Sequence, residues 1–348
     1  MKDMATQEEE VAPVETRTVA WQLGPRIFRF LATYGLVLII VLLFAVFSIL
    51  RPATFPTLFN IRGLLSSNST VAFLAIAEMV VVTANQFDLS IGYGVGLYTI
   101  LTVGLLVNQQ LPWPLVLIIV PAIGVIVGAV NGFLVTRVGI DSFIATLGVG
   151  TFLYGVSFWY APTQIVGTLP SGFTALAAEP GGVPMPIVIV LVIAALLFIM
   201  FEYLPVGRYL YMLGANPRAA ELTGISPRRY ITLAFVLSGL ITAIGAVVLG
   251  AQLQTASTAV GPDYLLPAFV GALLGSTAIR PGRANVLGTL VAVFVIAVAV
   301  AGLQQLGAQY FVNPMFNGAM LVIAVGVAST AARRRARAKA AADAAVVR

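Results

Sequence analysis

Long apolar runs separated by short polar segments repeat along almost the whole chain. A helix needs roughly 20 residues to cross a hydrocarbon core of about 30 Å. Runs of that kind lie near residues 31–50, 64–84, 114–135, 141–160, 186–204, 229–250, 285–305 and 312–331. Two weaker runs lie at 90–107, which is rich in glycine, and at 264–279, which is shorter. Counting both, the pattern predicts about ten spans.

The arginines support this count. If the chain starts inside and crosses ten times, the outer connections contain only Arg51 and Arg62. The inner side then holds a basic tail from Arg333 to Lys339 and the remaining loop arginines, namely Arg137, Arg208, Arg218, Arg228, Arg229, Arg280 and Arg283. Cytoplasmic flanks of membrane proteins carry such an excess of Lys and Arg. We therefore predict an all-α integral membrane protein with about ten transmembrane helices, both termini cytoplasmic, and one span short or re-entrant.

Composition leads to the same class. Of the 348 residues, 59% are hydrophobic and only 9% are charged, whereas soluble domains carry about a quarter charged residues. The predicted organisation is a cytoplasmic N-terminal tail (1–29), one transmembrane domain (30–331) and a basic cytoplasmic tail (332–348). Within the domain, Gly124, Gly128 and Gly132 have the four-residue spacing that lets two membrane helices pack closely.

The chain contains no cysteine and no histidine. Their absence excludes disulfides, thiolate or imidazole metal sites, and Ser-His-Asp or Cys-His catalysis. No Gly-x-x-x-x-Gly-Lys-Ser/Thr phosphate loop occurs. We expect no catalytic residue, metal or cofactor on this chain. The net charge of +6 belongs to membrane flanks, so nucleic acid is not an expected partner.

The longest inner connection, residues 205–229, carries the signals of a short capped helix. Asn216 is a favourable N-cap, Pro217 suits the first helical position, and Gly224 suits a C-cap. Such a helix could simply cover a long loop, or it could dock a cytoplasmic partner. The residues alone do not choose between these interpretations.

Five motifs, in order, resemble the bacterial ribose/xylose/galactoside class of ABC-importer permeases. They span roughly residues 60–330, and they are the segments 87–92 (Phe-Asp-Leu-Ser-Ile-Gly), 131–136 with 143–148, 214–225, 235–240 and 286–290. The first contains the family signature residues Asp88, Ser90 and Gly92. The chain departs from the family at Asn85-Gln86, where a Gly-Gly pair is usual, in the turn 275–283, which has fewer glycines, and at Glu78, where an apolar residue is usual.

The resemblance implies an importer permease for a sugar or polyol in the bacterial cytoplasmic membrane, surrounded by lipid. A separate cytoplasmic ATP-binding subunit would hydrolyse ATP with Mg²⁺, an extracytoplasmic substrate-binding protein would deliver the substrate, and a second permease copy would complete the pathway. The segment that would couple to the ATPase consists of Ala215, Asn216, Pro217, Arg218, Ala219, Ala220, Glu221, Leu222, Thr223, Gly224 and Ile225. The alternative is an ion-coupled secondary transporter of a small polar solute, with Glu78 and Asp88 as coupling sites.

Family analogy also suggests residues that line the pathway. The fifth and tenth spans of related permeases approach the molecular two-fold axis, which points to Phe143, Leu147, Thr151, Met315, Phe316 and Asn317. Glu78 joins them because a carboxylate within an apolar span usually faces a cavity or the bundle interior. It could equally be a structural carboxylate paired with Asn68 or Asn85. For Asp88, the simpler interpretation is a cap of the next span at its cytoplasmic end.

Overall fold

The computed structural model describes residues 23–309 and 311–326. The predicted tail 332–348 and most of the tail 1–29 lie outside these residues. Helix α1 (Leu23–Leu50) begins inside the segment predicted as a tail, so the first helix extends beyond the apolar run that starts at residue 31.

Each predicted apolar run contains helix. Within the described residues, seven helices are long and apolar enough to cross a membrane. They are α1, α4 (Ser90–Val107), α5 (Trp113–Phe133), α6 (Ser142–Tyr160), α8 (Met185–Tyr203), α11 (Pro227–Leu253) and α13 (Val286–Gln305). A five-residue π-helix, η2 (Leu134–Val138), extends α5. The described chain is therefore an all-α, multi-pass membrane protein.

The remaining apolar runs form broken or short helices. The run 64–84 is divided between α2 (Leu58–Ser67) and α3 (Ser69–Thr83), which are bent by 42°. The weak run at 264–279 becomes η5 (Pro262–Tyr264) and the eleven-residue α12 (Leu265–Gly275). A further short apolar helix covers Val312–Gly326.

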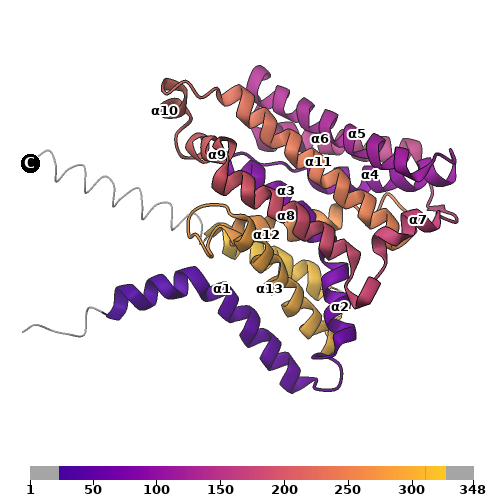
Figure 1. Cartoon of the computed structure of the whole chain (residues 1–348), viewed down its shortest axis with the longest axis horizontal. Coiled ribbons are helices and arrows are strands. Elements are labelled where there is room, and N and C mark those ends of the chain that lie inside the picture. Colours follow the sequence, from indigo (N-terminus) through magenta and orange to yellow (C-terminus); the bar gives the residue numbers. More distant parts are fainter. Residues whose placement is uncertain (1–22, 310, 327–348) are drawn as a thin grey trace, which may run out of the picture.

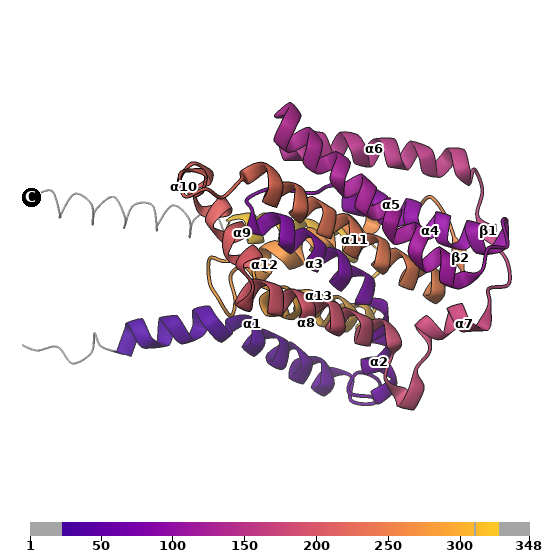
Figure 2. The same cartoon turned by 45° about the horizontal axis from the view of Figure 1, so that its top comes forward.

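Short elements lie at the two ends of the bundle. Helices α9 (Pro205–Ala215) and α10 (Pro217–Leu222) lie at one end (Figures 1 and 2). At the other end lie α2, α7 (Ser171–Thr174), the 3-10 turns η3 (Ala175–Ala177) and η4 (Pro180–Gly182), and the antiparallel pair β1 (Ile165–Val166) and β2 (Thr255–Ala256) (Figure 2). One end of the bundle is therefore formed by the short helices α9 and α10, and the other by short helices, 3-10 turns and a strand pair.

The centre of the bundle is α3, packed against α11, α12 and α13. Nearly every residue of α3 is buried, and the buried ones include Phe73 and Glu78. Peripheral α1 instead exposes large apolar side chains such as Leu42 and Ile49. Apolar side chains on the outside of a helix bundle suit contact with lipid.

Helices α5 and α11 pack closely through the glycines at four-residue spacing. A Cβ added at Gly128 would lie 2.2 Å from the Phe235 carbonyl oxygen, and one at Gly124 would lie 2.4 Å from that of Gly239. Only glycine fits such backbone contacts. The close packing predicted from the spacing is confirmed.

Candidate transport sites

A buried polar cluster surrounds the turn between α3 and α4. Asp88, which is 1% exposed, accepts hydrogen bonds at Oδ1 from Ser90 N (3.1 Å), Ser90 Oγ (2.5 Å) and Asn131 Nδ2 (3.3 Å). Its Oδ2 accepts one from Ser238 Oγ at 2.8 Å. The carboxylate therefore ties together α4, α5 and α11.

Side chains also satisfy the backbone of this turn. Phe87 N donates to Ser142 Oγ (3.2 Å), and Leu89 N donates to Thr146 Oγ1 (3.0 Å). Asp88 N donates to both carboxylate oxygens of Glu78, at 3.2 and 3.3 Å. With the Ser90 N–H held by Asp88, four consecutive amides are paired to side chains. Unpaired backbone groups inside a membrane cost several kcal/mol each, so the cluster is what permits a non-helical turn at this depth.

Glu78 is thus a structural carboxylate in this arrangement, and its predicted partners are wrong. Asn68 donates instead to the Leu64 carbonyl oxygen and to Ser67 Oγ. It precedes Glu78 by ten residues, which is about 15 Å along a helix. Glu78 is paired instead with the backbone amide of Asp88, on the other side of the turn between α3 and α4.

The motif residues converge on the same place. Asp88 accepts the N–H of the first residue of α4, as a cap would, but it lies in the interior rather than at an exposed helix end. Gly92 allows α4 to contact α12, because a Cβ there would lie 2.6 Å from Leu265 Cβ. Asn131 and Thr146 come from the second motif of the resemblance, and Ser238 comes from the fourth. Three motifs separated in sequence therefore form one structural unit.

Two departures from the family pattern coincide with left-handed backbone. Asn85, at the position of the first glycine of the usual pair, has φ = 56°. Asparagine tolerates this region better than most residues, so the turn keeps its shape without glycine. Ile279, in the turn with fewer glycines, has φ = 60°, and its N–H donates to the Thr33 carbonyl oxygen at 2.8 Å. A β-branched residue is uncommon in this conformation.

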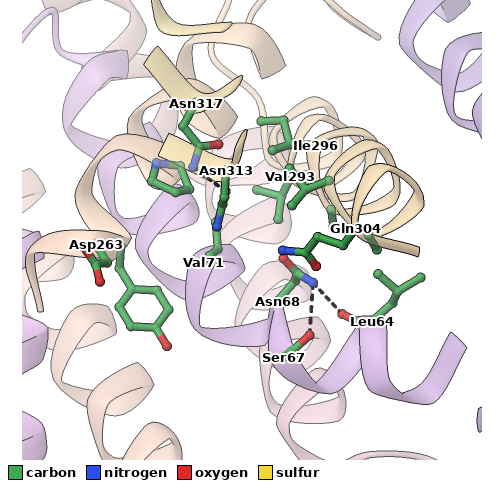
Figure 3. A pocket seen from close by; sticks show the side chains of 15 residues that line it. Leu64, Ser67, Asn68, Val71, Asp263, Val293, Ile296, Gln304, Asn313 and Asn317 are labelled. Atoms are coloured by element: carbon green, nitrogen blue, oxygen red, sulfur yellow. Dashed lines mark hydrogen bonds between the residues drawn. The ribbon is translucent and has the colours of Figure 1, made fainter. Parts of the chain in front are cut away.

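A polar cavity of about 340 Å³ lies at the end of the bundle opposite α9 and α10. Figure 3 shows its lining, contributed by the α2–α3 bend, η5, α12, α13 and the helix Val312–Gly326. The polar groups include four side-chain amides and one carboxylate, from Asn68, Gln304, Asn313, Asn317 and Asp263. Apolar side chains such as Val71, Val293 and Ile296 complete the wall.

Of the seven residues predicted to line a pathway, only Asn317 lines this cavity. Glu78 is fully buried in the cluster. Phe143, Leu147 and Thr151 lie on an exposed face of α6. Met315 is 68% exposed and Phe316 is half-buried. Sequence analysis missed the cavity residues Asp263, Gln304 and Asn313 as pathway residues. A usable signal was present, because Gln304 lies at the end of the apolar run 285–305 and Asn313 at the start of the run 312–331.

The predicted short helix in the loop 205–229 is confirmed as α10. Asn216 is its N-cap and accepts a hydrogen bond from Ala219 N at 3.1 Å. Gly224 follows the helix with φ = 85°, a left-handed conformation typical of helix ends. Ala220 and Ile225 are buried against the protein, and the exposed side chains include Arg218, Glu221 and Leu222.

Helix α9 connects this loop to the interior. A Cβ at Gly214 would lie 2.1 Å from the carbonyl oxygen of Thr83, the last residue of α3. Tyr211 donates from its hydroxyl to the Ala284 carbonyl oxygen at 2.7 Å. Burial raises the pKa of Tyr211, so the phenol remains a donor at neutral pH. An ion pair between Arg280 and Glu202 also holds the turn that contains Ala284.

No group of three or more His, Cys, Asp or Glu side chains that could hold a metal ion occurs among the described residues.

The apolar helices and the buried polar turn define a multi-pass membrane protein, and the chain's relatives are transport permeases. The chain belongs to the family described as the branched-chain amino acid transport system / permease component, which matches residues 60–325.

Several relatives match nearly the whole chain. The ribose import permease protein of Haemophilus influenzae is 28% identical over 317 residues, covering 90% of this chain and 96% of the relative. That of Bacillus subtilis is 30% identical and covers 88% and 92%. The autoinducer 2 import system permease protein of Klebsiella pneumoniae is 31% identical and covers 78% and 84%. No solved structure matches. The chain is therefore a permease component of the ABC-importer family, resident in the cytoplasmic membrane, and not a catalytic enzyme.

Proposed function

We propose that this chain is the permease subunit of an ABC importer that moves a sugar or polyol into the cytoplasm. The observation that carries the proposal is the similarity to ribose import permeases over 90% of the chain. The polar cavity supports it, since amide side chains beside apolar ones suit a hydroxyl-rich solute. An ion-coupled transporter is less well supported, because Glu78 is bound to the Asp88 amide and does not line the cavity.

The orientation we propose has ten crossings and both termini in the cytoplasm. Helix α1 begins at the end of the bundle that carries α9 and α10 (Figure 2). The arginines at 208, 218, 228 and 229 belong to this same region of the chain, in agreement with an excess of positive charge on the cytoplasmic side. The polar cavity then lies toward the outside.

Helix α10 is proposed to dock a separate ATP-binding subunit, which supplies ATP hydrolysis with Mg²⁺. Its support is an apolar side chain displayed to solvent between charges: Leu222 is 83% exposed and flanked by exposed Arg218 and Glu221. Exposed apolar anchors with a polar rim are typical of protein interfaces. Movement of α10 would reach the interior through α9, since Gly214 touches the end of α3.

The remaining partners are an extracytoplasmic substrate-binding protein and a second permease copy. The exposed face of α6 with Phe143, Leu147 and Thr151, together with Met315 and Phe316, is proposed to face the pathway between the two copies. Membrane lipid covers the other apolar faces. Two-fold dimers are the commonest symmetric arrangement of identical chains in soluble oligomers.

Co-purification in detergent with candidate ATP-binding subunits from the same organism tests the proposal. Wild type should retain the ATPase, and the double variant Arg218→Glu with Glu221→Arg should lose it while eluting as a folded protein. The matched control reverses two exposed charges at the opposite end, Arg51→Glu with Glu179→Arg, and should keep the ATPase bound. Failure of wild type to bind any ATPase, with ion-driven sugar uptake by the chain alone, would overturn the proposal in favour of a secondary transporter.

A further inference from the structure

We infer that the polar cavity between the α2–α3 bend, α12, α13 and the helix Val312–Gly326 is a binding site for one neutral polyhydroxyl molecule of monosaccharide size, built within a single copy of the chain. The inference rests on the proposed function, because it assigns the class of substrate to a particular place. A volume of about 340 Å³ lies at the lower end of the range for small-molecule sites.

The decisive group is the side chain of Asn317. It is 6% exposed and lines the cavity, and its Oδ1 has no hydrogen-bond partner within the described residues. Its Nδ2 donates to Asn313 Oδ1 at 2.9 Å, which fixes the orientation of the amide (Figure 3). A buried acceptor without a donor is costly and rare in native proteins. Oδ1 itself has almost no accessible surface, so a ligand hydroxyl supplies the missing donor once the side chain turns toward the cavity.

The other polar groups suit hydroxyl groups as well. Asn68 uses its Nδ2 for Leu64 and Ser67, so its Oδ1 remains an acceptor. The side chain of Gln304 forms no hydrogen bond among the described residues and can offer both a donor and an acceptor. A hydroxyl both donates and accepts, so it matches amides better than a purely anionic or cationic group does. The apolar side chains of Val71, Val293 and Ile296 can contact the C–H surface of a sugar ring.

Charge narrows the ligand class further. Among the described residues that line the cavity, Asp263 is the one charged residue, and none is a lysine or arginine. A phosphorylated or carboxylated sugar would bring a negative charge to a carboxylate without a compensating cation, which is unfavourable. The cavity therefore favours a neutral sugar or polyol. In the proposed orientation it lies at the outer end, where a substrate would arrive.

Because the chain has no cysteine, a single introduced thiol can report occupancy. Ser67→Cys puts a thiol of similar size in the lining, and Ser171→Cys puts one on an exposed surface at the same end of the bundle. The full-length variants in nanodiscs would be labelled with a charged maleimide in increasing concentrations of D-ribose, D-xylose or D-galactose, with D-glucuronate as the anionic comparison.

We expect at least one neutral sugar to slow labelling of Ser67→Cys in a saturable way and to leave Ser171→Cys unchanged. In the Ser67→Cys background, Asn317→Leu should raise the half-protecting concentration about fivefold, as expected for one lost hydrogen bond. Val322→Leu, at an exposed position on the same helix outside the cavity lining, should not change it. Gln304→Leu, at an exposed position, provides a second test that does not depend on the folding of Asn317→Leu.

Three outcomes would overturn the inference: no protection by any neutral sugar, protection equally strong with D-glucuronate, or protection unchanged by both Asn317→Leu and Gln304→Leu. The co-purification experiment separates this failure from failure of the proposed function. If the ATPase binds wild type and no sugar protects Ser67→Cys, the importer assignment stands and the cavity is not the site.

Discussion

Two polar regions inside this apolar bundle contrast in how well their hydrogen bonds are satisfied. In the cluster around Asp88, every side-chain polar atom of the residues that form it has a partner, except Asn131 Oδ1. In the cavity, Asn317 Oδ1 is buried without a partner, and the side chain of Gln304 has none among the described residues. The cavity holds about 340 Å³, and Asp88, Glu78 and Asn131 are not among the residues that line it.

This difference separates structural polar residues from residues available for a ligand. A carboxylate or amide within a membrane span is a functional hypothesis by default, and both regions would qualify by sequence. The two regions differ in whether their polar side chains already have hydrogen-bond partners. A fully paired group has no hydrogen bond left for a substrate. Glu78 and Asp88 thus hold the turn, while Asn317 remains available.

The largest expected effect comes from removing the carboxylate of the cluster. Asp88→Leu leaves the donors Ser90 N, Ser90 Oγ and Ser238 Oγ buried without an acceptor, while Asn131 Nδ2 keeps only its bond to Ser90 Oγ. At about 1–3 kcal/mol for each unsatisfied group, the loss should be about 3 kcal/mol or more. Thermal unfolding of the detergent-purified protein should show loss of the folded state. Asp88→Asn, which keeps the shape and one oxygen, is the control, and equal stability of Asp88→Leu and wild type would refute the structural role.

The next effect tests the helix contact that closes the cluster. Asn131 and Ser238 lie on α5 and α11, which meet at Gly128. Gly128→Ala places a Cβ 2.2 Å from the Phe235 carbonyl oxygen, and such overpacking should cost about 2–3 kcal/mol. Gly148→Ala, with nothing within 4 Å of the new Cβ, should be neutral or slightly stabilising. Unfolding midpoints that fall equally for both would contradict this explanation.

A smaller effect is expected at the turn that leads into the cluster. Asn85 has φ = 56° and an exposed side chain, so substitutions there act mainly through the backbone. Asn85→Val should destabilise the protein by about 1–2 kcal/mol because β-branched residues resist the left-handed region. Asn85→Gly should leave the unfolding midpoint unchanged or slightly higher. If both variants unfold like wild type, the turn does not depend on this conformation.

The smallest effect on stability is expected in the cavity. Asn317→Leu removes a buried acceptor that has no partner and frees only Asn313, which is exposed. Replacement by an apolar group of similar size should change the unfolding free energy by less than about 1 kcal/mol. The same variant should weaken protection by sugar. A variant that unfolds as readily as Asp88→Leu would mean that Asn317 is structural, and the contrast between the two regions would be lost.

Local patterns in the sequence determined much of the fold. The apolar runs predicted where helices form, since roughly 20 apolar residues are needed to span a bilayer. The Asn216-Pro217 and Gly224 signals predicted α10, because caps act within one helical turn. The spacing of Gly124 and Gly128 predicted a close helix contact, although not that α11 would be the partner. Ordered motifs likewise indicated the transporter family.

Tertiary structure decided what the polar residues do. Asp88 meets Ser238 across 150 positions in the chain, and no local pattern encodes that pairing. The same reason explains the wrong partners predicted for Glu78 and the missed cavity residues Asp263, Gln304 and Asn313. The bend between α2 and α3 falls in the polar stretch 66–70, inside what was predicted as the single apolar run 64–84. Whether a buried polar atom is paired depends on groups brought from distant segments, so only the folded arrangement separates the scaffold around Asp88 from the open acceptor of Asn317.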